Sequence, residues 1–347
     1  MERPTLDTVA AAAGVSRMTV SNAYNRPDQL SAATRERVLA VAAELGYAGP
    51  DPAGRSLRRG TSGAVGVVLT ESLSYAFTDP GLVSFLRGVA DTLTEAGHSL
   101  LLVPTHTDGG GDLVRDALVD AFVVCAVAED DPALDAVLGR GLPVVTVGSP
   151  RLKGRPFLGI DNAAAAGLAA EHLDGLGHRR LGVVALPARL PLDDGPVVDA
   201  RPGFALRVSG FVAAAQRSGA EAGSLTVVEA TTNTSDAGAA AARELLAARP
   251  RPTAVFAVSD VLALGVLRAA AELGLPVPGD LSVVGFDGIE EGARSSPPLT
   301  TISQDLRGQG RRAAAAALAA VAGNVGRPRQ PRPELTVRAS TAPPPRP

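Results

Sequence analysis

The chain has 347 residues, of which 46% are hydrophobic and 20% charged, and its formal net charge is −3 at pH 7. Its length exceeds one ordinary domain, and its composition is too apolar for a disordered chain and too often interrupted by charge for a membrane-spanning one. The only cysteine, Cys125, excludes an internal disulfide, and its place in the apolar run AFVVC favours a buried side chain over a reactive thiol. We therefore expect a soluble globular protein of two or three folding units.

The charge is unevenly distributed along the chain. Residues 1–60 hold eight arginines against six acidic residues, a net of +2, whereas the rest holds 25 basic and 30 acidic residues, a net of −5. A positive head on an acidic body suits a polyanion bound at one end. The N-terminal sequence MERPTLDTVA has an acidic second residue and no apolar signal-peptide core, so we expect the protein to stay in the cytoplasm, with no membrane partner.

The start of the chain is predicted to form three short helices. The first begins after Thr5, repeats apolar residues at the spacing i, i+3, i+4, i+7, and stops at Gly14. Ser16 caps the second helix and Ser31 caps the third. The residues expected to face inward from these two helices are Val20, Ala23, Tyr24, Val38, Val41, Ala42 and Leu45. This arrangement is typical of a helix-turn-helix unit.

The outward face of the second helix carries side chains suited to reading base pairs, namely Arg17, Met18, Ser21 and Asn22. In a major groove an arginine bonds guanine O6 and N7, an asparagine pairs with adenine, and a methionine methyl contacts the methyl of thymine. The short hydroxyl and amide side chains expected to hold phosphates around this face are Thr5, Ser16, Thr19, Ser21, Asn25, Ser31 and Thr34. The alternative is a plain solvated helix face.

Residues 5–47 resemble the DNA-binding headpiece of the LacI/GalR family of bacterial transcriptional repressors, in the runs TLDTVAAAAGVSRMTVSNAYN and LSAATRERVLAVAAELGY. The resemblance extends through nearly the whole chain. It implies that Arg17, Met18 and Asn22 read bases, and that a homodimer places two such helices on a palindromic DNA operator. Asn22 stands where an arginine is common in the family, which leaves the operator sequence open.

The segment PDPAGRSLRR resembles the hinge of the same family, which becomes helical on operator DNA and inserts a leucine into the minor groove. The resemblance implies that Leu57 is this wedge and that Arg55 and Arg58 approach phosphates or the narrow groove. A plain arginine-rich linker is the alternative. Gly54 stands where an alanine is common, at a cost of about 1 kcal/mol to a helix, so we expect a hinge that is disordered without DNA.

The resulting division is a headpiece at 1–49, a hinge at 50–61 and a core at 62–347. In the core, helical stretches alternate with eight apolar runs that are typical of strands: GVVLT, SLLLV, AFVVCAV, PVVTVG, LGVVAL, LTVVEA, AVFAV and LSVVGF. The runs FLGIDN at 157–162 and PPLTTI at 297–302 are interpreted as crossings between two lobes.

The family resemblance implies an α/β core like that of the periplasmic binding proteins (type I), with two lobes that are each a doubly wound parallel sheet. The lobe boundaries that follow are an N-lobe of about 62–160 plus 292–323 and a C-lobe of about 162–290 plus 324–340. Ligands of such folds bind beyond the carboxyl ends of the strands, so we expect a small-molecule effector in the cleft between the lobes.

The resemblance also implies roles for residues of this cleft. An arginine before a Gly-aromatic pair and an aspartate in a VG-aromatic-D motif grip effector hydroxyls in the family, which points to Arg207 in RVSGF and Asp287 in VGFD. A structural ion pair between the two is the alternative. Further residues at family-like positions are Asp161, Ser259, Asp260 and Gln304.

The N-lobe side of the cleft is predicted to come from the loop TESLSYAFTDP. Thr70 can hydrogen-bond a ligand there, and Tyr75 and Phe77 can stack on a ring, although packing of the following helix explains Phe77 equally well. Asn233 falls where sugar-binding relatives often carry a stacking aromatic, which argues against a simple pyranose ligand.

Catalytic and cofactor motifs are missing from the sequence. It contains no G-x-S-x-G elbow, and its only lysine, Lys153, is followed by Gly154 rather than by the Ser or Thr of a Walker A loop. The histidines show no metal-ligand spacing, and His172 and His178 are interpreted as helix-end or packing residues. We therefore expect no enzyme activity, no cofactor and no bound metal.

The function predicted from the sequence is a transcriptional regulator that binds DNA as a homodimer, acts as a repressor and responds to a small effector such as a sugar or a related polar metabolite. The alternative is a two-lobed binding protein of the transport-receptor class, which needs export and has no use for residues 1–60. An enzyme of nucleoside or sugar metabolism ranks last. The C-terminal region shows no heptad repeat, so a dimer is expected rather than a tetramer.

Overall fold

A computed structural model describes residues 4–49, 60–105, 110–187, 202–219 and 224–345. The chain divides into two compact units, Met1–Gly63 and Ala64–Pro347, and each is described by itself. The first unit contains the headpiece, and the second contains two lobes, here called the N-lobe and the C-lobe. The predicted hinge residues Arg55, Leu57 and Arg58 lie outside the described residues.

The headpiece contains α1 (Leu6–Ala13), α2 (Arg17–Asn25), the short 3₁₀ helix η1 (Pro27–Gln29) and α3 (Ala32–Glu44). Each α-helix begins at a predicted cap, because the side-chain oxygens of Thr5, Ser16 and Ser31 accept from the backbone N–H groups of Thr8, Thr19 and Thr34. Gly14 ends α1 with φ 64°, a left-handed conformation that glycine adopts without strain. The helix-turn-helix unit is therefore built from local chemistry at the helix ends.

The headpiece core is apolar and small, with Val9, Val20 and Val38 fully buried. Leu45, predicted to face inward, is instead exposed. It is the C-cap of α3, at the very end of the helix, and Tyr47, two residues later, packs against the core. The Tyr47 ring meets the Tyr24 ring edge-on, with centroids 6.0 Å apart, which closes this side of the headpiece.

The N-lobe sheet has the order β2-β1-β3-β4-β5, with every strand parallel to its neighbour. Its strands are β1 (Ala64–Leu69), β2 (Ser99–Pro104), β3 (Ala121–Cys125), β4 (Val144–Val147) and β5 (Phe157–Leu158). Val67 and Val123 pack on the side of α6 (Pro80–Glu95) and α14 (Leu306–Val321). Their chain neighbours Val68 and Val124 pack on the other side, with α7 (Gly110–Asp116) and α8 (Pro132–Gly139). The alternation buries both faces, as a doubly wound sheet requires.

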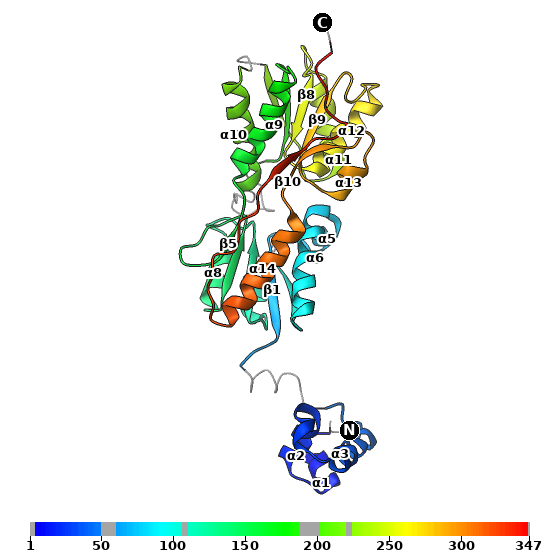
Figure 1. The fold of residues 1–347 in the computed structure, drawn as a ribbon, viewed down its shortest axis with the longest axis vertical. Helices are drawn as coiled ribbons and strands as arrows, with labels where there is room; N and C mark the ends of the chain where they lie inside the picture. The colour runs from blue at the N-terminus through cyan, green and yellow to red at the C-terminus, as the bar shows by residue number, and fades with distance from the viewer. Residues whose placement is uncertain (1–3, 50–59, 106–109, 188–201, 220–223, 346–347) are drawn as a thin grey trace. The chain divides into compact units, whose positions relative to one another are not determined.

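The C-lobe sheet has the order β11-β10-β9-β8-β6-β7, and only β11 runs antiparallel to its neighbour. Its strands are β6 (Leu181–Ala185), β7 (Leu225–Glu229), β8 (Ala254–Ala257), β9 (Ser282–Asp287), β10 (Thr300–Ser303) and β11 (Glu334–Thr336). Helices α9 (Asn162–Gly175) and α10 (Pro202–Arg217) cover one face, and α11 (Ser235–Leu246) and α12 (Asp260–Glu272) cover the other (Figure 1). The short helix α13 (Glu290–Arg294) lies beside α12.

The eight predicted strands all form, but the two predicted crossings contribute strands of their own. β5 belongs to the N-lobe sheet, so the first crossing follows Leu158. β10 pairs with β9, and Leu299 and Ile302 are fully buried in the C-lobe core, so the return crossing follows Ser303. Residues 292–303, predicted for the N-lobe, therefore lie in the C-lobe. The short polar run TTIS forms a strand because it lies between β9 and β11 in the sheet. The sequence pattern of the run itself does not indicate this pairing.

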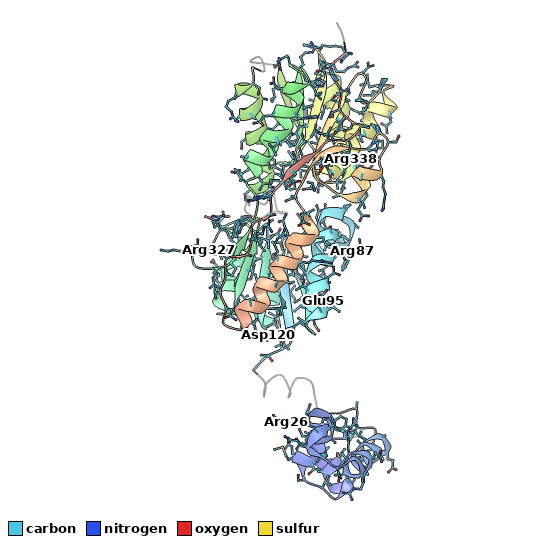
Figure 2. All side chains as sticks on the ribbon, in the orientation of Figure 1. Arg26, Arg87, Glu95, Asp120, Arg327 and Arg338 are labelled. Carbon is cyan, nitrogen blue, oxygen red and sulfur yellow. The ribbon has the colours of Figure 1, made fainter. Side chains whose placement is uncertain are left out.

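The C-terminal segment is held across the C-lobe sheet after β11. Arg338, labelled in Figure 2, donates from Nη1 to the carbonyl oxygen of Leu299 at 2.6 Å. Ser340 is fully buried, and its hydroxyl donates to the carbonyl oxygen of Val283 at 2.6 Å and accepts from the N–H of Thr300 at 2.8 Å. These contacts fix β10 beside β9.

Helix α14 returns to the N-lobe and packs closely on α6 (Figure 1). Two glycines permit the approach. A Cβ atom on Gly88 would lie 2.0 Å from the carbonyl oxygen of Arg307, and one on Gly310 would lie 2.0 Å from that of Phe85. The close packing brings the first turns of both helices to the edge of the N-lobe that faces the C-lobe.

Candidate functional site

The exposed face of α2 carries the three side chains predicted to read bases. Met18 is 68% exposed, an unusual position for a thioether on a helix of a small domain. Arg17 is also exposed, and its Nη1 lies 3.5 Å from Oδ2 of Asp7. Asn22 is half-buried and donates to Oε1 of Gln29 at 3.4 Å. Each functional group therefore has at most a long, exposed contact and remains available to a partner.

The hydroxyl groups predicted to hold phosphates have a second role in the headpiece. Thr5, Ser16 and Ser31 are the helix caps, and the hydroxyls of Ser16 and Ser31 also lie 2.9 Å and 2.8 Å from those of Thr19 and Thr34. All of these groups stay at or near the surface. A polyanion that met them would also meet the starts of α2 and α3, where backbone N–H groups carry partial positive charge.

Ser21 does not lie on the exposed face with Arg17, as the sequence had indicated. Its side chain is only 8% exposed. It follows Val20 directly and so sits at the edge of the packed side of α2, where Nδ2 of Asn25 donates to its hydroxyl at 3.3 Å and to its carbonyl oxygen at 3.0 Å. The hydroxyl of Ser21 and the amide of Asn25 are thus engaged with each other inside the headpiece.

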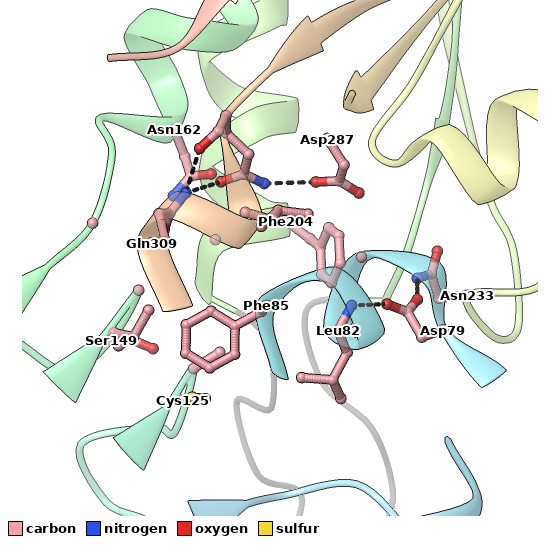
Figure 3. A pocket seen from close by; sticks show the side chains of 18 of the residues that line it. Asp79, Leu82, Phe85, Cys125, Ser149, Asn162, Phe204, Asn233, Asp287 and Gln309 are labelled. Atoms are coloured by element: carbon pink, nitrogen blue, oxygen red, sulfur yellow. Dashed lines mark hydrogen bonds between the residues drawn. The ribbon is translucent and has the colours of Figure 1, made fainter. Parts of the chain in front are cut away.

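A cavity of about 250 Å³ lies between the two lobes of the second unit (Figure 3). Its walls come from the ends of β1, β3, β4 and β9 and from the first turns of α6, α10 and α14. The predicted residues that line it are Thr70, Tyr75, Arg207, Asn233, Asp287 and Gln304. The lining mixes such polar groups with apolar ones, including Phe85, Phe204 and Leu306, which is typical of a site for a small molecule with both kinds of surface.

Arg207 is buried in the C-lobe wall of this cavity and bonded from several sides. Its Nε donates to Oδ1 of Asn162 at 3.0 Å, and its Nη1 donates to the carbonyl oxygen of Val258 at 2.7 Å and to Oδ1 of Asp287 at 3.1 Å. The guanidinium carbon lies 3.8 Å from the centre of the Phe286 ring. Among the described residues none accepts from Nη2, which leaves that group for a ligand.

Asp287 ends β9 and lines the cavity in a strained backbone conformation, with φ 125°. Its Oδ1 accepts from Arg207 and from Nε2 of Gln304, at 2.7 Å for the latter. Burial raises the pKa of Asp287 to about 7, although Arg207 acts in the opposite direction. The ion pair of Arg207 with Asp287, which the sequence left open as the alternative to effector binding, is present, and both of its residues also line the cavity.

Asp260 and Ser259, also predicted for the cleft, do not line the cavity but support residues that do. Asp260 is fully buried, and its Oδ2 accepts from the N–H groups of Gly288 and Ile289 at 2.7 Å and 2.9 Å, which fixes the turn after Asp287. The hydroxyl of Ser259 donates to Oδ1 of Asn233 at 2.5 Å. Both side chains act at the start of α12, one layer behind the cavity surface.

Two further predicted residues lie outside the cavity. Phe77 is 69% exposed, because α5 (Leu73–Thr78) turns its buried side, at Ala76, toward the lobe. Asp161 is the N-cap of α9, and its Oδ1 accepts from the N–H of Ala164 at 2.9 Å. The aspartate at the lobe crossing is therefore a helix cap, and the next residue, Asn162, is the one that lines the cavity.

Several lining residues were not predicted, among them Asp79, Phe85, Asn162, Phe204 and Gln309. Asp79 caps α6 with Pro80 at the first helical position, and this Asp-Pro pair at a helix start was visible in the sequence. The sequence did not reveal that Asp79 also contacts the C-lobe. Its Oδ2 accepts from Nδ2 of Asn233 at 2.9 Å, and the two residues are 154 positions apart in the chain. Gln309 donates to the carbonyl oxygen of Gln304 at 2.6 Å, which joins α14 to the end of β10.

The described residues contain no group of three or more His, Cys, Asp or Glu side chains placed to hold a metal ion. His178 is buried, with Nδ1 2.9 Å from the hydroxyl of Thr253 and Nε2 2.8 Å from the carbonyl oxygen of Ala342, and burial lowers its pKa. Across the same part of the chain, no helix has the length and apolar character that crossing a bilayer needs.

Comparison with known families matches both units of the chain. Residues 5–49 match the family described as "Bacterial regulatory proteins, lacI family", and residues 170–341 match the "Periplasmic binding protein-like domain". An HTH-type transcriptional regulator of Mycobacterium tuberculosis is 45% identical over 324 residues, which is 90% of this chain and 89% of the relative. The HTH-type transcriptional regulator IpsA of Corynebacterium glutamicum is 40% identical over 313 residues, 86% of each chain.

Solved structures show the same architecture. The lac repressor dimer bound to operator and the anti-inducer ONPF has a TM-score of 0.79 at 26% identity, covering 98% of this chain and all of that one. The complex of the transcriptional regulator CelR with cellobiose has a TM-score of 0.69 at 31% identity, covering 97% of this chain and 100% of the other. The two-lobed α/β core and the helix-turn-helix headpiece are therefore the fold of these regulators.

Proposed function

Because the chain belongs to the LacI family of bacterial transcriptional regulators, we propose that it is a repressor that binds a palindromic operator as a homodimer and that a small polar effector in the cleft controls this binding. The observation that carries the proposal is that one chain contains both a helix face suited to DNA and a cavity suited to a small molecule. The headpiece carries Arg17, Met18 and Asn22 on the outer face of one helix, and the core contains a cavity lined by Arg207 and Asp287.

The DNA side of the proposal assigns base reading to the exposed face of α2. Arg17 bonds guanine from two nitrogens, Met18 contacts a thymine methyl, and Asn22 exchanges its long contact with Gln29 for an adenine. Phosphates are held by the cap hydroxyls and their threonine neighbours: Thr5, Ser16, Thr19, Ser31 and Thr34. The likeness to a repressor dimer bound to its operator supports this assignment.

The effector side of the proposal assigns the cavity to a sugar or a related polyhydroxylated metabolite. A ligand hydroxyl accepts from Nη2 of Arg207 and donates to Asp287, while apolar faces of the ligand rest on Phe85 and Phe204. The similar regulator CelR has been solved with cellobiose, which supports a sugar-like ligand. Binding at the interface of two lobes couples the ligand to their relative position, and this change reaches the headpiece.

A two-stage experiment on the full-length chain tests the proposal. A thermal-shift screen of metabolites identifies ligands, since a ligand at 100 times its Kd adds about 2.7 kcal/mol to stability. Each positive metabolite is then titrated into the protein–operator complex while fluorescence anisotropy reports DNA binding. We expect at least one ligand to change operator affinity five-fold or more. A ligand that binds with Arg207 intact yet leaves operator affinity unchanged would contradict effector control.

A further inference from the structure

The side chain of Asn233 bridges the two lobes at one end of the cavity. It is buried, and it projects from the loop after β7 of the C-lobe. Its Nδ2 donates to two groups of the N-lobe, Oδ2 of Asp79 at 2.9 Å (Figure 3) and the hydroxyl of Tyr75 at 3.1 Å. The Tyr75 hydroxyl itself donates to the same Asp79 oxygen at 3.0 Å. One amide thus meets a carboxylate and a phenol of the other lobe.

The bridge is anchored at a helix start on each side. In the N-lobe, Asp79 is the N-cap of α6, and its Oδ1 accepts from the N–H of Leu82 at 2.7 Å. In the C-lobe, Ser259 is the N-cap of α12; its hydroxyl accepts from the N–H of Leu262 at 3.2 Å and donates to Oδ1 of Asn233. The chain of bonds therefore runs from the first turn of one helix to the first turn of another, through a single amide.

An amide suits this position for a chemical reason. The Ser259 hydroxyl occupies Oδ1, so Nδ2 is turned to the N-lobe, where the Asp79 carboxylate provides a strong acceptor. If the lobes moved apart, Asn233 would exchange its hydrogen bond to the Asp79 carboxylate for hydrogen bonds to water, and hydrogen bonds to charged groups contribute more net stability than neutral ones. An aromatic side chain at this position would offer a ligand a flat surface but no such bond between the lobes.

We propose that Asn233 is an inter-lobe clasp, a positioning residue that holds the two walls of the cavity together before any effector binds. The clasp raises the fraction of chains whose cavity is already assembled, and that fraction multiplies the apparent affinity for an effector. Tyr75, predicted to stack on a ligand ring, is drawn into the clasp through its hydroxyl. The inference concerns the lobes alone, so its test needs no effector and no operator.

The test measures the distance between the lobes in the full-length chain without ligand. Spin labels are placed on cysteines that replace the exposed Leu118 of the N-lobe and Leu273 of the C-lobe, and labelled chains are diluted with unlabelled ones. The native Cys125 is half-buried and lines the cavity, so it is replaced by serine in every chain and only the two introduced thiols are labelled. Pulsed electron resonance then gives the distance distribution for the parent and for each clasp variant.

Three variants separate a clasp from simple packing. Asn233→Asp places a carboxylate opposite Asp79, so we expect a shift to longer and broader distances. The reciprocal double change Asp79→Asn with Asn233→Asp restores one amide and one carboxylate with their roles exchanged, and asparagine also caps α6, so we expect the parent distribution to return. Thr232→Ala, the exposed neighbour, is the matched control and leaves the distances unchanged.

Each outcome decides the matter. Parent-like distances in a folded Asn233→Asp chain would overturn the clasp. A double variant that stays as open as the single one would also overturn it, because exchanging the amide and the carboxylate restores a hydrogen bond between the two residues. If Asn233→Asp does not fold, Asn233→Ala is measured in its place, with the same expected opening and the same contradicting result. A failure of effector or operator binding in any variant bears on the proposed function and leaves the distance measurement intact.

Discussion

On the headpiece, Arg17 and Met18 project from α2 into solvent, whereas in the core Arg207 and Asp287 are buried and bonded to several neighbours. The first pair makes one long, exposed contact, between Arg17 and Asp7, and stays available for the proposed DNA partner. The second pair is already organised, so the same side chains serve the fold and the proposed ligand. Substitutions in the two regions should therefore separate binding from stability on the headpiece and couple them in the cleft.

The largest effect is expected from Arg207→Ala. It leaves the Asp287 carboxyl buried without its cation, and breaking a buried pair in this way costs about 3–5 kcal/mol of unfolding free energy. Urea unfolding of the full-length chain measures the loss. The exposed pair of Arg243 with Glu272, 2.8 Å apart, offers the matched control, and Arg243→Ala should cost less than about 1 kcal/mol. Equal losses of unfolding free energy in the two variants would contradict the claim that the buried pair stabilises the fold more than the exposed pair does.

A dependence of stability on pH should follow from Asp287. Its pKa of about 7 in the fold lies above the ordinary value of 3.8, so between these values the folded chain keeps a proton that the unfolded chain has released. This contribution to stability is therefore present at acid pH and is lost as the pH rises toward 7. Relative to Asp287→Asn, the parent should lose on the order of a few kcal/mol from about pH 4 to about pH 7.

Urea unfolding at a series of pH values checks this second prediction. Parallel stability curves for the parent and Asp287→Asn would mean that the carboxyl ionises in the fold as it does in the unfolded chain.

Substitutions at exposed positions of the headpiece are expected to change DNA binding without changing the stability of the fold. Arg17→Ala should cost about 1–3 kcal/mol of binding at one operator position and relax the choice of base there, while the unfolding free energy changes little. Thr34→Ala should instead weaken binding to every sequence alike, since a phosphate contact carries no base information. Competition assays with operators changed at single positions distinguish these outcomes. A uniform loss for Arg17→Ala would show that it contacts only the backbone of the DNA.

The smallest expected effect separates the two roles of a cap hydroxyl. Ser31→Ala should remove about 1 kcal/mol from the stability of the headpiece, because the N–H of Thr34 loses its acceptor. Ser31→Asp keeps the cap but faces any phosphate with a negative charge, so stability should persist while DNA affinity falls. Thermal unfolding and DNA titration of the same two variants give both quantities. Unchanged DNA affinity in Ser31→Asp would place the phosphates elsewhere.

The two regions also differ in how far the sequence could predict them. The helices of the headpiece follow from chemistry within four residues, so Thr5, Gly14, Ser16 and Ser31 were identified as their ends. Ser21 was misplaced because a small polar residue at the edge of a helix face is buried or exposed according to its neighbours. In the core, the pattern of apolar runs predicted the strands that are buried on both faces.

The cleft depends instead on contacts that span the chain. Asp79 was missed and the surroundings of Asn233 were not foreseen, because the bond between them joins residues 154 positions apart. Phe77 was expected beside a ligand, but the orientation of a six-residue helix is decided by the lobe it packs on. Asp260 was assigned to the ligand, whereas it supports the turn after β9. The positions of the motifs predicted which segments form the cleft. They did not predict which residues of these segments line the cavity and which support it from behind.

The central claim, that α2 reads a symmetric DNA site from a pair of chains, is tested most directly by selection from random duplex DNA. The full-length protein is incubated with the library at moderate salt, with and without a metabolite mixture, and bound sequences are enriched and read. We expect an inverted repeat to dominate, with specificity lost at one base of each half-site in Arg17→Ala. A library that shows no enriched inverted repeat under either condition would contradict the account.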